Sequence, residues 1–207
     1  MNTDVFIIET GTANLASVRS GLRRVGATPR TATSPQTVVE SSHVVLPGVG
    51  SFAAALRQIT HKGLAEAVAA RVVEGRPTLA ICLGMQLLCE GSAESPADSG
   101  LGVLPGALAQ FSSGVRVPHL GWNRVEPSPG SNYLREGFAY FAHSYRLSKA
   151  PPGWIAASTE YGGVFVSAIE RAGILACQFH PELSADWGTA VLRRWLDLSA
   201  DVCKTQC

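Results

Sequence analysis

Short apolar runs alternate with amphipathic segments along the first half of this chain. The apolar runs are typical of buried strands and lie at residues 5–8, 43–46 and 77–82, and a further strand is expected near residues 30–32. Apolar residues recur at helical spacing in the segments between and after them, which are residues 15–25, 52–59, 64–73 and 85–90. This alternation predicts an α/β fold in which helices flank a mainly parallel sheet.

The second half of the chain has a different pattern of apolar and polar residues. From residue 101 onward, short β-like runs such as residues 114–118 are broken by glycine and proline, which predicts antiparallel hairpins and a mixed sheet edge. Helical spacing returns in residues 185–198, and we expect a frayed tail over residues 201–207. Asn14 is a suitable N-cap for the first helix, and Gly26 a suitable end. With no linker or repeat, residues 1–207 are expected to form one domain with a core from about residue 4 to 200.

Composition narrows the classes of function. Hydrophobic residues make up 46% of the 207 residues and charged residues 16%, as in a globular protein rather than a disordered one. The net charge of +1 gives no electrostatic reason to expect nucleic acid or an anionic membrane as partner. Five cysteines at irregular positions suit neither a disulfide framework nor a zinc motif, so no metal is expected. Because no signal peptide or membrane-length apolar stretch is visible, the expected location is cytoplasmic.

Cys82 lies where the apolar run 77–82 meets the next helical segment. Ala80 and Gly84 stand two positions to either side, as in the sharp strand-to-helix turn that presents a nucleophile. A helix N-terminus favours negative charge, so the thiol is expected to ionise more readily than a free one. The alternative is a plain core cysteine, which is the commoner state of an isolated free cysteine.

His180 and Glu182 follow an apolar run near the C-terminus. Side chains at i and i+2 of an extended segment point the same way, so Glu182 can bind one imidazole nitrogen while the other faces a nucleophile. A surface turn is the alternative for this pair alone. Together with Cys82, the pair predicts a Cys–His–Glu triad, in which a thiolate attacks a carbonyl and histidine moves protons.

A glycine-rich loop, Pro47-Gly48-Val49-Gly50-Ser51, follows the apolar run 43–46. Such a loop can aim backbone N–H groups at a developing oxyanion without side-chain obstruction. A dinucleotide-binding loop is the rival interpretation, but it lacks the acidic residue at the usual spacing.

Three motifs together resemble the class I (triad-type) glutamine amidotransferases: residues 47–50, Cys82-Leu83-Gly84-Met85-Gln86 and Gln178-Phe179-His180-Pro181-Glu182. Residues 13–18, 118–123 and 140–145 further resemble the glutaminase subunits of imidazole glycerol phosphate synthases, which serve histidine biosynthesis. The resemblance runs from about residue 5 into the final helix. It implies a flavodoxin-like class I amidotransferase fold, L-glutamine as the substrate and no cofactor.

The resemblance also implies roles for individual residues. The catalytic triad would be Cys82, His180 and Glu182. The oxyanion hole would consist of the backbone N–H groups of Leu83 and Val49, whose loop is expected to reorient before it donates. The residues implied in glutamine binding are Gly50, Gln86, Ser144 and Tyr145. The residues implied at a partner interface are Asn14 and Trp122, although Trp122 could equally be a core aromatic of a hairpin.

That partner is expected to be a (β/α)8-barrel cyclase, which would form a heterodimer with this chain and receive its ammonia. The products would be imidazole glycerol phosphate and an aminoimidazole carboxamide nucleotide. The chain departs from many relatives at three places: residues 9–14 have lost one glycine, Leu183 replaces a basic residue, and Ala80 replaces glycine.

Three alternatives stay open from the sequence. A different triad amidotransferase, such as an anthranilate or aminodeoxychorismate synthase subunit, would share the chemistry but is not expected to carry residues 118–123. A free-standing cysteine hydrolase would be active without a partner. A non-catalytic interaction protein would have no physical reason to keep all three triad residues.

Overall fold

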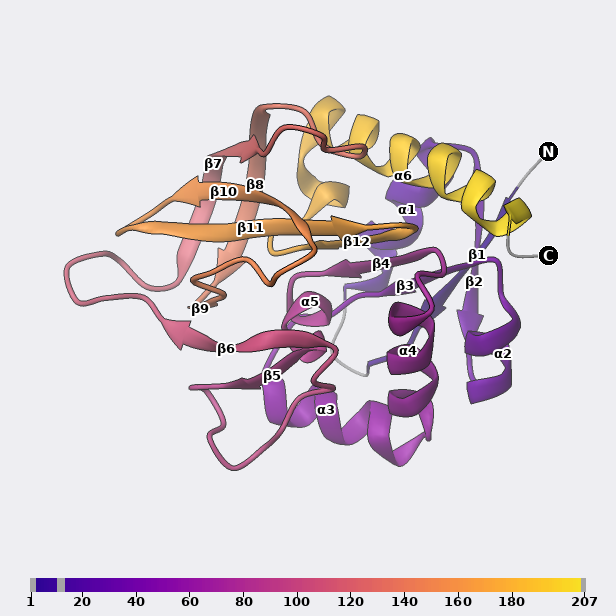
Figure 1. Cartoon of the computed structure of the whole chain (residues 1–207), viewed down its shortest axis with the longest axis horizontal. Helices are drawn as coiled ribbons and strands as arrows, with labels where there is room; N and C mark the ends of the chain where they lie inside the picture. Colours follow the sequence, from indigo (N-terminus) through magenta and orange to yellow (C-terminus); the bar gives the residue numbers. More distant parts are fainter. Residues whose placement is uncertain (1–2, 11–13, 206–207) are drawn as a thin grey trace.

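The computed structural model describes residues 3–10 and 14–205, with residues 200–205 described by their backbone only. The described residues form a mixed sheet of order β2-β1-β3-β4-β12-β11-β10-β7-β8 and a small sheet of order β5-β6-β9 (Figure 1). The parallel part consists of β1 Thr3–Ile8, β2 Ala27–Ala32, β3 His43–Leu46, β4 Thr78–Ile81 and β12 Ile174–Cys177. The antiparallel part adds β11 Val164–Arg171, β10 Ile155–Glu160, β7 His119–Pro127 and β8 Gly137–His143.

Helices cover both faces of the large sheet. Figure 1 shows α1 and α6 on one side and α3 and α4 on the other. The helices are α1 Leu15–Arg24, α2 Pro35–Glu40, α3 Phe52–His61, α4 Leu64–Val73, α5 Leu83–Leu88, the 3-10 helix η1 Pro181–Leu183 and α6 Ala185–Thr205. The strands β5 Cys89–Ser92, β6 Leu104–Gln110 and β9 Tyr145–Arg146 form the small sheet. This is the α/β architecture that the hydrophobic pattern predicts, including antiparallel strands in the second half.

The central parallel strands are buried on both faces. Every residue of β3 and β4 is buried, which explains why these strands are continuous apolar runs rather than alternating ones. Val45 and Leu79 pack with α1 and α6, whereas Val44 and Ala80 pack with α3, α4 and α5. The carboxyl ends of β3, β4 and β12 therefore lie at one edge of a rigid, doubly covered layer, which is where α/β folds place their ligands.

Several predicted elements agree with the structure and others do not. The Asn14 side chain caps α1 by accepting from the Ser17 N–H at 3.4 Å, and Gly26 follows the helix with φ of +88°. The short helix α2 was not predicted, although Ser34 supplies its N-cap and Pro35 its first turn. The fold depends on this helix because Val38 joins the core beneath it.

Three predicted boundaries are wrong. The helix expected over residues 85–90 begins at Leu83 and ends at Leu88, because buried Cys89 adopts extended backbone and starts β5. Residues 114–118 form turns that lead into β7 rather than a strand, and the Val117–Pro118 peptide bond is cis. The last helix continues to Thr205, since residues 189–205 contain neither glycine nor proline. The predicted frayed tail is thus wrong up to residue 205, and residues 206–207 lie outside the described residues.

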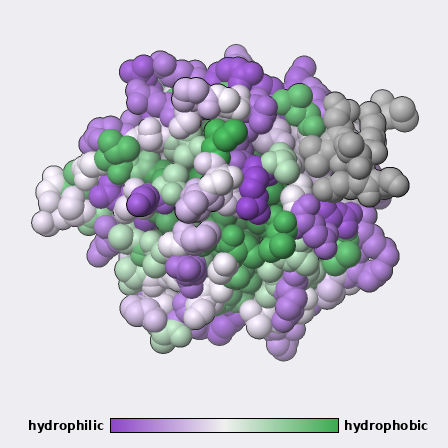
Figure 2. Space-filling model, viewed as in Figure 1, coloured by the Kyte–Doolittle hydropathy of each residue, from purple (hydrophilic) through white to green (hydrophobic). Residues whose placement is uncertain are grey.

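The surface is mixed in character. On the face shown in Figure 2, polar residues dominate the rim while hydrophobic residues gather towards the centre. Among the helices of the described residues, none combines the length and the apolar character needed to cross a bilayer.

Candidate active site

Cys82 occupies a strained turn between β4 and α5. Its φ of 52° and ψ of −109° are unusual for a residue with a side chain, and such strain is typical of nucleophiles held on a tight elbow. The Cys82 N–H donates to the Cys177 carbonyl at 2.7 Å, which ties the elbow to β12. Gly84 is indispensable to the turn, since a Cβ there would lie 1.9 Å from the Leu46 carbonyl oxygen.

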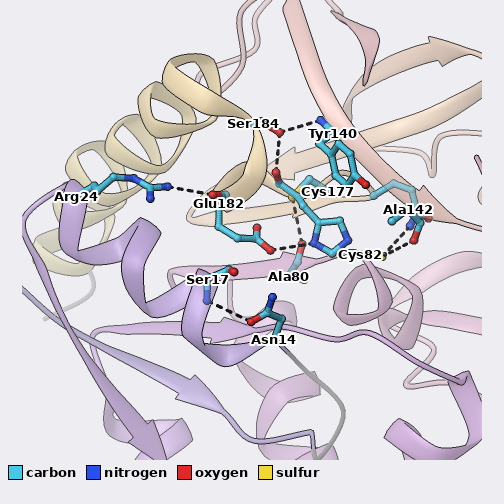
Figure 3. Close-up of polar contacts among 12 residues, drawn as sticks. Asn14, Ser17, Arg24, Ala80, Cys82, Tyr140, Ala142, Cys177, Glu182 and Ser184 are labelled. Atoms are coloured by element: carbon cyan, nitrogen blue, oxygen red, sulfur yellow. Dashed lines mark hydrogen bonds and ion pairs between the residues drawn. The ribbon is translucent and has the colours of Figure 1, made fainter. Parts of the chain in front are cut away.

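His180 reaches the same place from the neighbouring strand. Because β12 runs parallel to β4 and pairs Cys177 with Ile81, the residues after both strands emerge at one edge of the sheet. The His180 Nδ1 atom lies 2.9 Å from Oε1 of Glu182. Figure 3 shows Cys82 beside Ala142, to whose carbonyl the Cys82 thiol donates at 3.9 Å. The His180 backbone is fixed by its N–H donating to the Tyr140 carbonyl at 2.9 Å.

The environment favours a charged imidazole. Burial alone would lower the pKa of His180, but hydrogen bonds and the negative charges of Cys82 and Glu182 outweigh burial and raise this pKa to about 10. His180 is therefore an imidazolium at neutral pH, as an acid that protonates a leaving amine must be. Gly21 leaves room for the carboxylate, because a Cβ at this glycine would lie 3.1 Å from Cβ of Glu182.

A pocket opens directly onto Cys82. Its lining includes six residues that the sequence resemblance implies in oxyanion or glutamine binding, namely Val49, Gly50, Leu83, Gln86, Ser144 and Tyr145. Cys82 lines the same pocket, and the remaining two predicted chemical residues, His180 and Glu182, are joined to each other by their 2.9 Å hydrogen bond. A volume bounded by a nucleophile, backbone amides and side-chain amides suits a small polar substrate.

The expected first oxyanion donor is already engaged. The Leu83 N–H donates to the Gly48 carbonyl at 3.4 Å, which is a weak bond. Gly48 approaches so closely that a Cβ on it would lie 2.7 Å from Cβ of Leu83. In this conformation of the loop at residues 47–51, the N–H predicted to be the first oxyanion donor is therefore bonded to the loop itself.

Comparison with known proteins shows to which family the chain belongs. The family model for class I glutamine amidotransferases matches residues 6–197. The chain belongs to this family. It is 39% identical over 206 residues to the imidazole glycerol phosphate synthase subunit HisH of Symbiobacterium thermophilum, covering 98% of this chain and 97% of that protein. It is 37% identical over 197 residues to the HisH subunit of Methanothermobacter thermautotrophicus, covering 94% of this chain and 98% of that protein.

A third relative is longer. The chloroplastic imidazole glycerol phosphate synthase hisHF of Arabidopsis thaliana is 39% identical over 199 residues, which cover 93% of this chain but 34% of that protein. Solved structures share the fold at low identity. A glutamine amidotransferase crystal structure matches with a TM-score of 0.76 at 20% identity, covering 94% of this chain and 98% of its own. The PurLQS structure from Thermotoga maritima matches with a TM-score of 0.73 at 18% identity, covering 95% of this chain and 99% of that chain.

Two residues at this amidotransferase site were missed by sequence reasoning. Glu94, from the loop after β5, lines the pocket and accepts from the Phe52 N–H at 3.3 Å, so it caps α3 in place of Ser51. Gln178 is fully buried and donates from Nε2 to the Cys82 sulfur at 3.6 Å. Gln178 stands in a quoted motif but had no assigned role, and nothing local marks Glu94.

The predicted interface residues lie outside the pocket. Asn14 caps α1, which is the structural role expected of it, and Trp122 is 54% exposed on β7. Trp122 is therefore not a core aromatic. Leu120 and Phe138 are exposed on the same face of the β7–β8 pair, and Leu120 also borders the pocket. Of the departure at residues 9–14, residues 11–13 lie outside the described residues. Within the described part of the chain, no cluster of His, Cys, Asp or Glu could hold a metal.

Proposed function

We propose that this amidotransferase is the glutaminase subunit of an imidazole glycerol phosphate synthase. It hydrolyses L-glutamine to glutamate and ammonia and passes the ammonia to a (β/α)8-barrel cyclase in histidine biosynthesis. The observation that supports the chemistry best is the Cys82 elbow, which lines a pocket and lies next to the buried His180–Glu182 pair. The pathway is supported by near full-length similarity to HisH subunits.

The reaction follows from the geometry. The Cys82 thiolate attacks the side-chain carbonyl of glutamine, and the oxygen takes the negative charge. The His180 imidazolium then donates its proton to the nitrogen as ammonia leaves, which gives a γ-glutamyl thioester. Neutral His180 next takes a proton from water, whose oxygen attacks the thioester and releases glutamate. Glu182 holds Nδ1 throughout, so the proton moves at Nε2.

Substrate orientation follows from the charges of the pocket. An amino acid carries an ammonium group, and the Glu94 carboxylate is the acidic group that lines the pocket. Gly50, Ser144 and Tyr145 offer backbone and hydroxyl groups to the carboxylate end. We therefore add Glu94 to the predicted glutamine-binding residues, with its carboxylate facing the ammonium.

The loop at residues 47–51 supports control by the partner. Rotating the Gly48–Val49 peptide plane would move the Gly48 carbonyl off the Leu83 N–H and turn the Val49 N–H towards the oxyanion. One rotation would thus free both predicted donors, and losing one such donor costs about 10²–10³ in turnover. A partner that binds the rotated state more tightly would shift the population towards it.

The partner is proposed to dock on the exposed apolar face formed by Leu120, Trp122 and Phe138, beside the pocket. Interfaces favour aromatic residues at their centre, and ammonia passing there would not be diluted into water. Leu183, 41% exposed, supplies no charge, but Arg24 lies beside it and donates to the Glu182 carbonyl at 3.0 Å.

The test is steady-state glutaminase activity of the purified chain, alone and then with a barrel cyclase and its nucleotide ligand. We expect at least a 100-fold increase with the complex, and a loss of that increase in Trp122→Ala. Val73→Ala is the matched control, since Val73 is 68% exposed on α4, away from this face. Full activity without any partner would instead favour a free-standing hydrolase.

A further inference from the structure

Two buried histidines beside the pocket take no part in the triad. His119 at the start of β7 and His143 at the end of β8 are 3% and 5% exposed and are paired in the strand register. The His119 Nδ1 atom lies 3.1 Å from Nε2 of His143. The His119 ring is stacked on Phe141 and on Tyr161, with centroid distances of 4.8 and 4.0 Å. These contacts hold the pair in one orientation.

The pocket end of the pair fixes where its protons lie. His143 Nδ1 is 2.9 Å from the Tyr145 carbonyl, which can only accept, so Nδ1 carries the proton. Burial and nearby positive groups lower the pKa of His143 to about 3, so this ring is neutral and its Nε2 has no proton. The bond between the histidines must then be donated by Nδ1 of His119.

The other end requires the same arrangement independently. The Asn123 amide oxygen accepts from the Arg124 N–H at 2.7 Å, and its Nδ2 donates to the Glu160 carbonyl at 2.9 Å. The remaining N–H of Asn123 points at His119 Nε2 at 3.3 Å, which must therefore be an acceptor. Both ends agree on one state, with each histidine neutral and protonated on Nδ1.

The Tyr145 carbonyl connects this pair to the nucleophile. It also accepts from Gln86 Nε2 at 3.1 Å, and Gln86 Nε2 donates to Gln178 Oε1 at 3.0 Å. Gln178 Nε2 in turn donates to the Cys82 sulfur at 3.6 Å. Both N–H groups of Gln86 are thereby engaged, so its oxygen alone is left for a ligand. An acceptor there suits the ammonium group of an amino acid.

We propose that His119 and His143 form a positioning relay for the glutamine pocket. The relay holds the Tyr145 carbonyl, and through it the Gln86 amide, in the orientation that binds substrate. This inference rests on the proposed function, since it concerns how glutamine is held. The chain of donors runs from Asn123 to Tyr145 without a break, so removing either ring interrupts it.

Substitutions that differ in one hydrogen bond test the relay. Leucine at position 119 or 143 removes the donor, and we expect KM for glutamine to rise about tenfold with kcat within about threefold of wild type. Asparagine places an amide N–H near the position of Nδ1, so His119→Asn and His143→Asn should return KM to within about threefold. All variants are assayed in the activated complex.

His43 provides the matched control. It is 2% exposed, and burial lowers its pKa to about 4. His43 is the first residue of β3, at the end remote from Gly48, and its Nε2 atom is hydrogen-bonded to the Ser199 hydroxyl. His43→Leu should lose comparable stability while leaving KM unchanged. If the wild-type complex is active but KM for His119→Leu is no higher than KM for His43→Leu, the relay is overturned while the proposed function stands. A wild-type complex that hydrolyses no glutamine would instead contradict the proposed function.

A second measurement does not depend on activity or on variants. Nitrogen-15 NMR of the wild-type imidazole rings reports which nitrogen carries the proton. We expect both His119 and His143 to be protonated on Nδ1 and to stay neutral at pH 6. A proton on Nε2 of either ring would refute the relay even if the leucine variants failed to fold.

Discussion

Replacing Gly84 by alanine tests the geometry on which the nucleophile depends. The added Cβ would lie 1.9 Å from the Leu46 oxygen, about 1.5 Å closer than the 3.4 Å at which ordinary contact begins. Neither atom belongs to a flexible side chain, so the end of β3 and the start of α5 must move apart. We expect a loss of about 3 kcal/mol in the free energy of unfolding, at the upper end of overpacking effects.

The effect on catalysis should exceed the effect on stability. Misplacing a catalytic group by about 1 Å can cost about 10²-fold in rate, and here both the Cys82 elbow and the loop after Leu46 would move. Gly91→Ala is the control, because its Cβ would meet only the Asp98 oxygen at 3.6 Å. Gly48→Ala, with a Cβ 2.7 Å from the Leu83 side chain, should fall between them.

The test is to measure the free energy of unfolding in urea and the glutaminase turnover in the activated complex for the three variants. The expected order of damage is Gly84, then Gly48, then Gly91. If Gly84→Ala kept wild-type stability and turnover, the close approach of the elbow to β3 would not be a real constraint.

Three further results are expected. A glutamine-analogue electrophile should label Cys82 but not Cys89 or Cys177, since burial raises the pKa of Cys89 to about 12 and also raises that of Cys177; mass spectrometry showing the reverse would refute Cys82 as nucleophile. Glu182→Gln should lower kcat by about 10²–10⁴-fold with little change in KM, and near-normal turnover would show that the carboxylate does not act. Burial lowers the pKa of His119 to about 4 and that of His143 to about 3, the latter also facing His119, His180 and Arg146. The unfolded chain then binds more protons than the folded chain between pH 6.5 and 4. Urea unfolding should therefore show the free energy of unfolding decreasing by a few kcal/mol as the pH is lowered from 6.5 to 4. An unchanged free energy over this range would contradict the burial of these histidines in their neutral form.

The sequence carries the local parts of the site. Ala80 and Gly84 mark the elbow because steric demands fall on residues two positions from Cys82, and these demands are visible in any strand-to-helix turn. His180 and Glu182 are predictable as a pair because they lie only two residues apart, although Glu182 lies in the 3-10 helix η1 rather than in the extended backbone that was expected. Their meeting with Cys82 was predicted from the residue types, but it depends on β12 lying beside β4, and no local pattern predicted that strand pairing.

Non-local features could not be predicted. Glu94 reaches α3 from a loop 42 residues away, and His119 meets His143 across 24 residues through strand pairing. No spacing rule encodes such contacts. The bond between the Leu83 N–H and the Gly48 carbonyl is equally invisible, because it reflects one of two orientations that the same glycines permit. The ends of elements were predicted wrongly where tertiary packing determines them. For example, buried Cys89 is the first residue of β5 rather than a residue of α5.

The position of β12 has a consequence for how the protein comes into being. This strand is synthesised last of all the strands, yet it is inserted between β4 and β11, in the middle of the large sheet. During translation the thiol therefore emerges long before the base that must act with it, and the parallel and antiparallel parts remain unjoined until residues 174–177 dock. Such long-range pairing is slow to form. A nascent or truncated chain would hold the nucleophile without the ability to consume glutamine, so hydrolysis begins only once the sheet is closed.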